Sequence, residues 1–455
     1  MKNIFKTMIV SAWMSVIMGM AAGNISVPVF GAAVGQPEQV EDNMEPGDSE
    51  ETEEEKTEEA EEEVDEQEDE IEKVKLAKPV LCAASKPDGK IKITWKKVDG
   101  AAEYVLFRST EKDSGFRKIY RTRTERSYID EKRSNGKSYY YRMTVLSKGR
   151  TGRAKSKTVA GRSLNKVELS EISNLSGSRK LVLHWNPVKG AAGYQIQRKN
   201  TAGQYKIIAN VKGTKNSFTD KERNGGKTYT YRVCAIDAHG GRGNYSEPLA
   251  KMAIDNNQKM IALTYDDGPS EYTPIVLDAL EKYGAHATFF VVGNRVNQYG
   301  DSLRREKLLG CEIGNHTYAH NNLKNLGVMQ ILSVISETNQ AVKMQNGVDI
   351  YIMRPPGGGY NATVCNAVGM PIILWSVDTL DWRTRNTAAT IQCVKEKAND
   401  GAIVLMHDLH QPTANAADAV IGYLQQAGYQ MVTVSEMAAY RGGMIPGKVY
   451  SQFKK

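Results

Sequence analysis

Two adjacent carboxylates, Asp266 and Asp267, have the residue types that acid–base and metal chemistry require. The apolar run at residues 260–263 predicts a buried strand just before them, and Gly268 and Pro269 predict a turn directly after them. Adjacent side chains at the end of a strand point to different sides. One carboxylate can therefore bind a metal ion while the other stays free as a base. The alternative interpretation is a solvated Asp-Asp-Gly turn without chemistry.

Two histidines four residues apart, His316 and His320, offer nitrogen ligands. On one helical turn both imidazoles reach a single ion, and a carboxylate from Asp266 or Asp267 makes a third ligand. Two histidines and one carboxylate leave positions open for water and substrate, as catalytic zinc sites do. A surface histidine pair is the alternative interpretation of this spacing.

Three further polar residues complete a set for hydrolysis: His407, Asp381 and Arg354. A bound ion lowers the pKa of water toward neutrality and polarises a carbonyl. The free aspartate can then take a proton from that water, and His407 is the candidate that gives a proton to the leaving group. Asp381 is available to raise the pKa of His407 and fix its tautomer, and Arg354 can keep the base carboxylate ionised. The set predicts metal-assisted hydrolysis of an acyl group.

These residues need a scaffold that brings distant segments together. Seven apolar runs predict buried strands at 259–265, 287–292, 311–313, 350–353, 371–377, 402–406 and 429–433. Amphipathic stretches predict helices at 273–283, 301–309, 328–345, 361–368, 387–399 and 414–427. Alternating strands and helices predict a parallel sheet, and seven such strands predict a barrel. The polar motifs follow the carboxyl ends of the strands, which is the rim where barrels build active sites.

The segment before the barrel contains one unit twice, with a period of 90 residues. Trp95 corresponds to Trp185, and the register holds without a break as far as Arg142 and Arg232. Each copy has short runs of alternating apolar and polar residues, which predict a small antiparallel sandwich with the Trp in its core. The two copies resemble fibronectin type III modules, which implies a binding or spacing role and no catalysis.

The net charge of +7 over 455 residues is divided into three blocks. Residues 38–72 contain 21 acidic residues and one lysine, residues 73–252 contain 40 basic and 14 acidic residues, and residues 253–455 contain 17 basic and 18 acidic residues. The acidic block predicts a disordered, self-repelling spacer. The basic block predicts electrostatic binding of anionic wall polymers, with a charged surface that serves only solubility as the alternative. No nucleic acid partner is expected. Five cysteines without CxxC spacing predict no disulfide framework.

The first residues have the pattern of an export signal. Lys2 and Lys6 precede an apolar run over residues 8–22, and small residues follow that run. The pattern predicts a cleaved signal peptide, with an uncleaved membrane anchor as the alternative. The body of the protein is therefore expected to be secreted or bound to the cell wall or cell surface, with membrane contact only through an uncleaved N-terminal segment.

The predicted domains are a signal peptide or anchor (1–33), an acidic disordered linker (34–77), two sandwiches (78–163 and 164–252), a barrel (253–440) and a loose C-terminal tail (441–455).

Five motifs in residues 259–440 resemble those of the polysaccharide deacetylases of carbohydrate esterase family 4, in the same order. The motifs begin at Thr264 (Thr-Tyr-Asp-Asp-Gly-Pro), His316 (His-Thr-x-x-His), Arg354 (Arg-Pro-Pro-Gly), Asp381 (Asp-Trp) and Leu405 (Leu-Met-His). The family fold is a distorted parallel barrel. The resemblance therefore implies a multidomain chain in which two all-β fibronectin type III-like sandwiches precede an α/β distorted parallel barrel.

The resemblance also implies a role for each matching residue. The implied acid–base residues are Asp266 as the base, His407 as the acid, Arg354 beside Asp266, and Asp381 beside His407. The implied ligands of a zinc ion, or of another divalent transition metal such as cobalt, are Asp267, His316 and His320. The implied walls of the acetyl pocket are Trp382 and Leu405.

One position departs from the family pattern. The family often has Tyr where this chain has Gly357, and in the family the backbone N–H of that residue helps to hold the oxyanion. Glycine keeps this donor but loses the ring that shapes the groove. We expect Tyr360 to refill the space.

The sequence thus predicts an exported metal-dependent deacetylase that acts on the N-acetyl groups of a polymeric amino sugar in the cell wall. Peptidoglycan N-acetylglucosamine is the predicted substrate. Chitin or its oligosaccharides, N-acetylmuramic acid and acetylxylan are alternatives within the same class of enzyme. The alternative from another class is a wall-binding protein with an inactive barrel.

Overall fold

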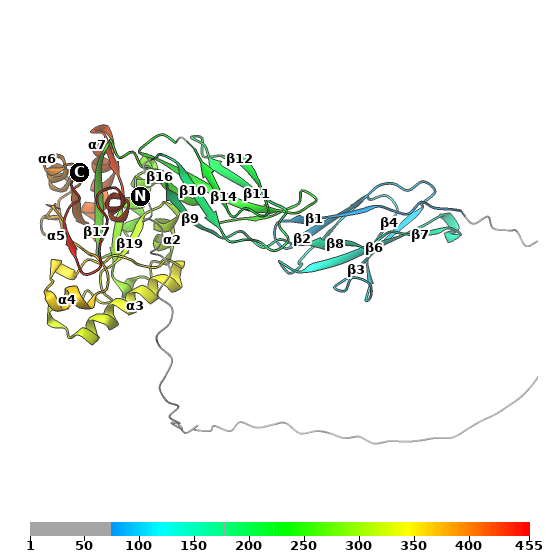
Figure 1. Ribbon diagram of the computed structural model, residues 1–455, viewed down its shortest axis with the longest axis horizontal. Coiled ribbons are helices and arrows are strands. Elements are labelled where there is room, and N and C mark those ends of the chain that lie inside the picture. Colours follow the sequence, from blue (N-terminus) through cyan, green and yellow to red (C-terminus); the bar gives the residue numbers. More distant parts are fainter. Residues whose placement is uncertain (1–73, 176–177, 222) are drawn as a thin grey trace, which may run out of the picture. The chain divides into compact units, whose positions relative to one another are not determined.

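The computed structural model describes residues 74–175, 178–221 and 223–455, which Figure 1 draws in colour. The predicted signal peptide and the acidic residues 38–72 lie outside these ranges, as does most of the predicted linker. Within the described ranges, no helix is both long enough and apolar enough to cross a membrane. All five cysteines fall inside them and are free thiols.

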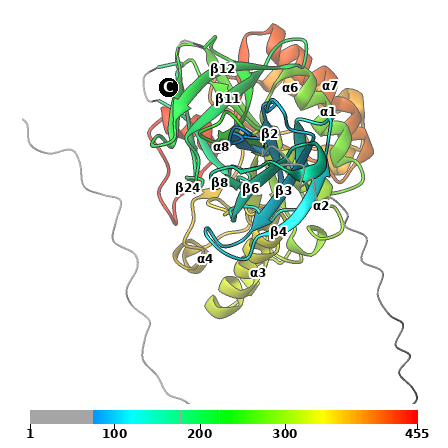
Figure 2. The same cartoon turned by 90° about the vertical axis from the view of Figure 1, so that its right-hand side faces the viewer.

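The first repeat folds as two antiparallel sheets, with strand orders β1-β2-β5 and β4-β3-β6-β7, and with β8 also beside β6. Figure 2 shows strands β3, β4 and β6 side by side. The strands are β1 (Leu81–Lys86), β2 (Lys90–Trp95), β3 (Glu103–Ser109), β4 (Arg117–Thr122), β5 (Ser127–Asp130), β6 (Ser138–Leu146), β7 (Arg153–Lys155) and β8 (Val159–Arg162). Trp95 is buried between the sheets with Tyr104 and Tyr141, as the alternating pattern predicts.

The second repeat has the same arrangement, with strand orders β13-β10-β9 and β12-β11-β14-β15, and with β16 also beside β14. Its strands are β9 (Leu169–Asn174), β10 (Leu181–Trp185), β11 (Gly193–Lys199), β12 (Tyr205–Lys212), β13 (Ser217–Asp220), β14 (Lys227–Ile236), β15 (Arg242–Tyr245) and β16 (Leu249–Ala253). Trp185 is buried in its core. We call the two repeats sandwich 1 and sandwich 2.

The 90-residue period extends to individual contacts. Each sandwich has a buried aspartate whose carboxylate accepts hydrogen bonds from an arginine and a tyrosine. The equivalent sets are Asp130 with Arg108 and Tyr141, and Asp220 with Arg198 and Tyr231. A buried carboxylate is stable only when it is paired, and both copies pair it with equivalent residues. The two repeats therefore have the same fold. The all-β prediction for this region is confirmed.

The barrel is built on a parallel sheet with the strand order β19-β18-β17-β22-β21, and β23 pairs with the first residues of β17. The strands are β17 (Lys259–Asp266), β18 (Thr288–Val291), β19 (Glu312–Asn315), β20 (Ile372–Ile373), β21 (Val377–Asp378), β22 (Ile403–His407), β23 (Tyr429–Met431) and β24 (Val449–Tyr450). Strand β17 is buried from its second residue onward, as expected of a strand at the centre of a parallel sheet.

Two predicted strands are shorter than the apolar runs suggested. The run at 350–353 contributes only a parallel bridge at Met353, which joins Asn315 to Ile372. Pro355 and Pro356 follow Arg354 and have no N–H to continue a ladder. The run at 371–377 is divided between β20 and β21.

The C-terminal residues 441–455 are not the loose tail that we expected. Strand β24 pairs in parallel with β20, and Phe453 is buried. The backbone N–H of Phe453 donates to Gly401 at 2.9 Å. Gly401 has a φ of +89°, and a side chain there would collide with the backbone of Phe453. The tail is therefore part of the barrel wall.

Helices cover the sheet, and Figure 2 shows α1, α6 and α7 side by side. The helices are α1 (Thr273–Tyr283), α2 (Gly300–Leu308), α3 (Val328–Asn346), α4 (Ala362–Ala367), α5 (Asp381–Thr384), α6 (Thr387–Lys397), α7 (Gln411–Gln426) and α8 (Val434–Tyr440), with 3-10 turns η1 (Lys148–Arg150), η2 (Gly293–Arg295), η3 (Leu323–Asn325) and η4 (Pro356–Gly358). The six predicted helices are confirmed. Helix α8 was not predicted, although Thr433 and Glu436 form a capping box that the sequence carries.

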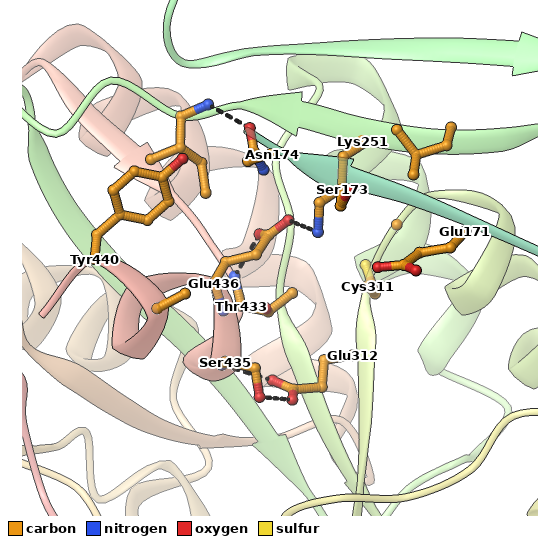
Figure 3. Close-up of a pocket in the computed structure, with 14 residues that line it drawn as sticks. Glu171, Ser173, Asn174, Lys251, Cys311, Glu312, Thr433, Ser435, Glu436 and Tyr440 are labelled. Carbon is orange, nitrogen blue, oxygen red and sulfur yellow. Dashed lines mark hydrogen bonds and ion pairs between the residues drawn. The ribbon is translucent and has the colours of Figure 1, made fainter. Parts of the chain in front are cut away.

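Sandwich 2 and the barrel share core packing and buried charge. Met252, in the last strand of sandwich 2, and Ile254, just after that strand, belong to the same apolar cluster as Phe290 and Met437 of the barrel. Figure 3 shows the pocket beside this contact, where Lys251 reaches Glu436 at 2.8 Å. None of the predicted site residues lines this pocket.

We expect Met252→Ala to lower the free energy of unfolding of the barrel by about 2–4 kcal/mol, because it removes a fully buried side chain and leaves a cavity. Denaturant unfolding of the full chain would measure this. Met329→Ala is the matched control, because Met329 is 76% exposed and its truncation should change stability by less than about 0.5 kcal/mol. Equal effects of the two substitutions would contradict the shared core.

Candidate active site

The proposed base and acid lie on paired strands. Asp266 is the last residue of β17 and His407 is the last residue of β22, and the parallel register places them opposite each other. Both are almost fully buried, with exposed fractions of 3% and 9%. Strand pairing, rather than a loop, therefore brings these two residues together.

Asp267, His316 and His320 form a cluster that can hold a metal ion. The Oδ1 atom of Asp267 lies 3.4 Å from Nε2 of His316 and 3.2 Å from Nε2 of His320. One ligand atom from each residue lies within 4.8 Å of the others, and this is the only such cluster among the described residues. Burial would raise the pKa of Asp267, but the two imidazoles outweigh burial and lower it.

The donor set fits a divalent transition metal. Nδ1 of His316 lies 2.7 Å from the carbonyl oxygen of Arg354, which can only accept, so Nδ1 carries the proton. The lone pair of Nε2 then faces Asp267, as a metal-binding histidine requires. The buried Oδ1 of Asp267 has no hydrogen-bond partner among the described residues. An ion would satisfy this oxygen together with both imidazoles.

The two histidines do not lie on one helical turn, which corrects our expectation. They lie in the loop between β19 and η3, where Thr317 and His320 have φ values of +64° and +55°. Left-handed residues of this kind cannot continue a right-handed helix. The Asn315 side chain holds the loop by accepting from the N–H of Thr317 at 2.7 Å. The loop still brings both imidazoles to Asp267, but through backbone conformations that are unfavourable for residues other than glycine.

Arg354 is completely buried and touches Asp266 directly. Its Nη1 donates to Oδ1 of Asp266 at 2.7 Å and to Thr264 at 2.8 Å. Its other nitrogens donate to the carbonyl oxygens of Ile373 and Leu374. Burial lowers the pKa of Arg354, although Asp266 opposes that shift. Oδ2 of Asp266 lies 3.8 Å from Nε2 of His316, so this oxygen faces the metal cluster.

Asp381 and His407 form the second polar pair. Oδ1 of Asp381 lies 2.9 Å from Nδ1 of His407, and Oδ2 accepts from the backbone N–H of His407 at 2.8 Å and from Thr413 at 2.7 Å. Burial would lower the pKa of His407, but Asp381 and the charge of Asp266 outweigh burial and raise it. Nδ1 is engaged, so Nε2 is the ring nitrogen left for a substrate.

Gly357 presents a free donor at an exposed turn. Its φ is +62°, and its N–H makes no hydrogen bond to any described residue. No atom lies within 4 Å of the position that a Cβ would take. Tyr360 therefore does not refill the space beside Gly357, which corrects our expectation. Its ring is 43% exposed instead.

The two residues predicted to form the walls of the acetyl pocket, Leu405 and Trp382, differ in burial. Leu405 is buried on β22, and its carbonyl accepts from Thr379 at 2.8 Å. Trp382 follows Asp381 on α5 and is 46% exposed. The ring contact found for Trp382 is with the guanidinium of Arg383, at 6.0 Å. Trp382 is thus next in sequence to Asp381, the partner of His407, and has no described contact to His407 itself.

Two residues at the site were not predicted. Thr264 donates to the carbonyl of Val404 at 2.6 Å while it accepts from Arg354, so it links β17, β22 and the arginine. Asp408 follows His407 and is fully buried, and burial raises the pKa of its carboxyl to about 7. The sequence could have indicated Asp408, because a carboxylate next to a predicted catalytic acid is itself a candidate for a role at the site.

Known proteins are similar to parts of this chain. A sequence model of the family described as polysaccharide deacetylase matches residues 253–370. The chain is 35% identical over 256 residues to the peptidoglycan-N-acetylmuramic acid deacetylase PdaC of Bacillus subtilis, which covers 56% of this chain and 52% of that protein. It is 43% identical over 180 residues to the peptidoglycan-N-acetylglucosamine deacetylase PgdA of Listeria monocytogenes, which covers 39% of each protein.

A shorter relative is matched over most of its length. The chain is 35% identical over 197 residues to a peptidoglycan-N-acetylglucosamine deacetylase of Bacillus cereus, which covers 41% of this chain and 92% of that protein. The solved structure of peptidoglycan deacetylase PdaC from Bacillus subtilis is 41% identical, covers 41% of this chain and 93% of that chain, and gives a TM-score of 0.41.

We expect His316→Ala to weaken zinc binding by about 100-fold or more, because two protein ligands hold an ion poorly. Calorimetric titration of the full chain with zinc, after removal of metal by a chelator, would measure this. His184→Ala is the matched control, since His184 is an exposed histidine of sandwich 2. Unchanged zinc affinity in His316→Ala would show that the cluster is not the metal site.

Proposed function

This chain belongs to the polysaccharide deacetylase family, and from that premise we propose that it removes N-acetyl groups from peptidoglycan N-acetylglucosamine. The observation that carries the proposal is the pairing of Asp266 with His407 beside the cluster of Asp267, His316 and His320. Relatives named for peptidoglycan support the choice of polymer, and two of those reported above are named for N-acetylglucosamine. N-acetylmuramic acid is the second candidate, because another relative is named for it.

The proposed mechanism begins with a proton transfer to Asp266. A divalent metal held by Asp267, His316 and His320 supplies a Lewis acid and an acidified water when it is bound. Asp266 is bound by Arg354 through Oδ1, which leaves Oδ2 directed to the metal cluster. Oδ2 is therefore the atom proposed to take the proton from the attacking water.

The second proton transfer is assigned to His407. Asp381 holds Nδ1, so the proton for the leaving amine comes from Nε2. The unpaired N–H of Gly357 is a donor for the negative charge that develops on the carbonyl oxygen. Removal of the acetyl group leaves acetate and a free amine on the sugar.

The sandwiches are proposed to be fibronectin type III modules of an exported enzyme. Both show a tyrosine corner, in which a tyrosine hydroxyl near the start of a strand bonds to backbone a few residues upstream. Tyr139 accepts from the N–H of Ser134 at 3.1 Å, and Tyr229 accepts from the N–H of Asn224 at 3.0 Å. Export is consistent with a wall polymer as substrate, which lies outside the membrane.

We expect Asp266→Asn to keep its zinc but to lose about two to four powers of ten in kcat, the usual share of a general base. Acetate release by the full chain would be measured on peptidoglycan, chitin oligomers and acetylxylan, with and without a chelator. The wild-type chain should release acetate only when metal is present.

Two outcomes would contradict this assignment. Loss of zinc in Asp266→Asn would mean that the two aspartates have exchanged roles. No acetate from any of these glycans, with zinc bound, would favour the wall-binding protein with an inactive barrel.

The pH dependence of kcat should depend on the Asp381–His407 pair. An acid must be protonated to act, so kcat should fall as pH rises through the pKa of His407, which lies above its ordinary value. In Asp381→Asn this alkaline limb should move down by about one pH unit or more, because a raising charge is lost. Zinc-saturated pH profiles of both chains would show the shift, and an unmoved limb would exclude His407 as the acid.

The sandwiches carry a positive surface that suits an anionic wall polymer. The edge strand β4 and the residue after it expose four basic side chains: Arg117, Lys118, Arg121 and Arg123. Charged edge strands also prevent sheets from aggregating, so charge alone does not establish binding. A basic surface nevertheless concentrates a protein near phosphates and carboxylates, and salt weakens that attraction.

We expect replacement of these four residues by Gln to reduce sedimentation of the full chain with purified cell walls several-fold at low salt. Wild-type protein should be released as the Debye length falls to about 3 Å near 1 M salt. The matched control replaces the exposed barrel residues Lys395, Lys397, Lys454 and Lys455 by Gln. If the two sets of substitutions reduce sedimentation equally, or if salt does not change the binding, we would conclude that the sandwiches are spacers.

A further inference from the structure

Asp408 faces the loop that carries the proposed base and metal ligand. Its side chain is completely buried, and its Oδ2 accepts a hydrogen bond from the hydroxyl of Thr273, the first residue of α1. Both carboxylate oxygens lie so close to Gly268 that a Cβ at that position would collide with them. Asp408 therefore fills the space directly beneath the backbone that follows Asp267.

The backbone of Asp408 fastens the same loop. Its carbonyl oxygen accepts from the hydroxyl of Ser270 at 2.6 Å. The N–H of Ser270 donates to the Thr273 hydroxyl at 2.8 Å, so Thr273 bonds to both the loop and the carboxylate. On the other side, the N–H of Val292 donates to the carbonyl of Gly268 at 2.9 Å.

This loop has a conformation that needs support. Asp267 has a φ of +71°, which is unfavourable for a residue other than glycine. Strained residues persist only where their surroundings determine them fully. Asp408 is not itself part of the metal cluster within the described residues. Asp408 instead directly follows His407 in the chain and contacts the loop that follows Asp267. This one residue therefore connects the acid with the loop that carries the base and a metal ligand.

We propose that Asp408 is a positioning residue that, together with Thr273, holds Asp266 and Asp267 in register with His407. Its effect on turnover rests on the function proposed above, whereas its effect on metal affinity does not. Outer partners of a metal ligand typically change affinity or activity by about 10- to 100-fold when they are removed.

The test compares Asp408→Ala with Asp408→Asn in the full chain. We expect Asp408→Ala to weaken zinc binding by about 10- to 100-fold and to lower kcat by a similar factor, with KM changed by less than about twofold. Asp408→Asn keeps an oxygen that can accept from Thr273, so it should recover both quantities to within about threefold of wild type. Calorimetry with zinc alone and acetate release from peptidoglycan give the two readouts.

Two further variants separate positioning from stability. Glu436→Ala removes another buried carboxylate, far from the loop in sequence, and should lower the Tm without weakening zinc binding. Thr273→Val removes the shared donor and should weaken zinc binding as Asp408→Ala does, which keeps the test informative if Asp408→Ala fails to fold. The double variant should be little worse than either single variant, because both act on one unit.

The proposal is overturned if Asp408→Ala lowers the Tm but leaves zinc affinity and kcat within about twofold of wild type. It is also overturned if Asp408→Asn is as impaired as Asp408→Ala. Should the wild-type chain release no acetate at all, the proposed function fails, and the zinc affinities of the same variants still decide the role of Asp408.

Discussion

The buried guanidinium of Arg354 is the constraint on which the rest of the site depends. A charge with no exposed surface must be paired and fully hydrogen-bonded, and removal of one partner of such a pair costs about 3–5 kcal/mol. Arg354 meets this demand with Asp266, Thr264 and the carbonyls of Ile373 and Leu374. The proposed base is thus also the counter-charge of the core, and its position cannot relax independently of the barrel.

The backbone of Arg354 extends this constraint to the metal cluster. Its carbonyl accepts from Nδ1 of His316, and its N–H donates to the carbonyl of Asn315 at 2.9 Å. One residue therefore orients the base through its side chain and a metal ligand through its main chain. His407 is placed separately, by the pairing of β22 with β17. Sites supported by strands in this way hold their geometry better than sites built on loops alone.

The sequence predicted which residues converge, because motifs after parallel strands must meet at one rim. It did not predict the path of the loop between His316 and His320, since no glycine marks the left-handed residues Thr317 and His320. Strand β24 was missed because two residues have no periodicity to read. The position of the Tyr360 side chain was predicted wrongly, because the positive φ angles of Gly357 and Gly358 change the direction of the chain. The sequence alone does not give these angles.

The contacts of sandwich 2 lie at the opposite ends of the strands from the site. Lys251 of the sandwich pairs with Glu436 of the barrel, and His286, two residues before β18, contacts the same carboxylate at 2.9 Å. Burial would raise the pKa of Glu436, but His286 and Lys251 outweigh burial and lower it. Separation of the sandwich would leave this carboxylate with one cation fewer in a buried place. Sandwich 2 is therefore joined to the barrel energetically, and its contact through Glu436 is separate from Asp266 and His407, which are the last residues of β17 and β22.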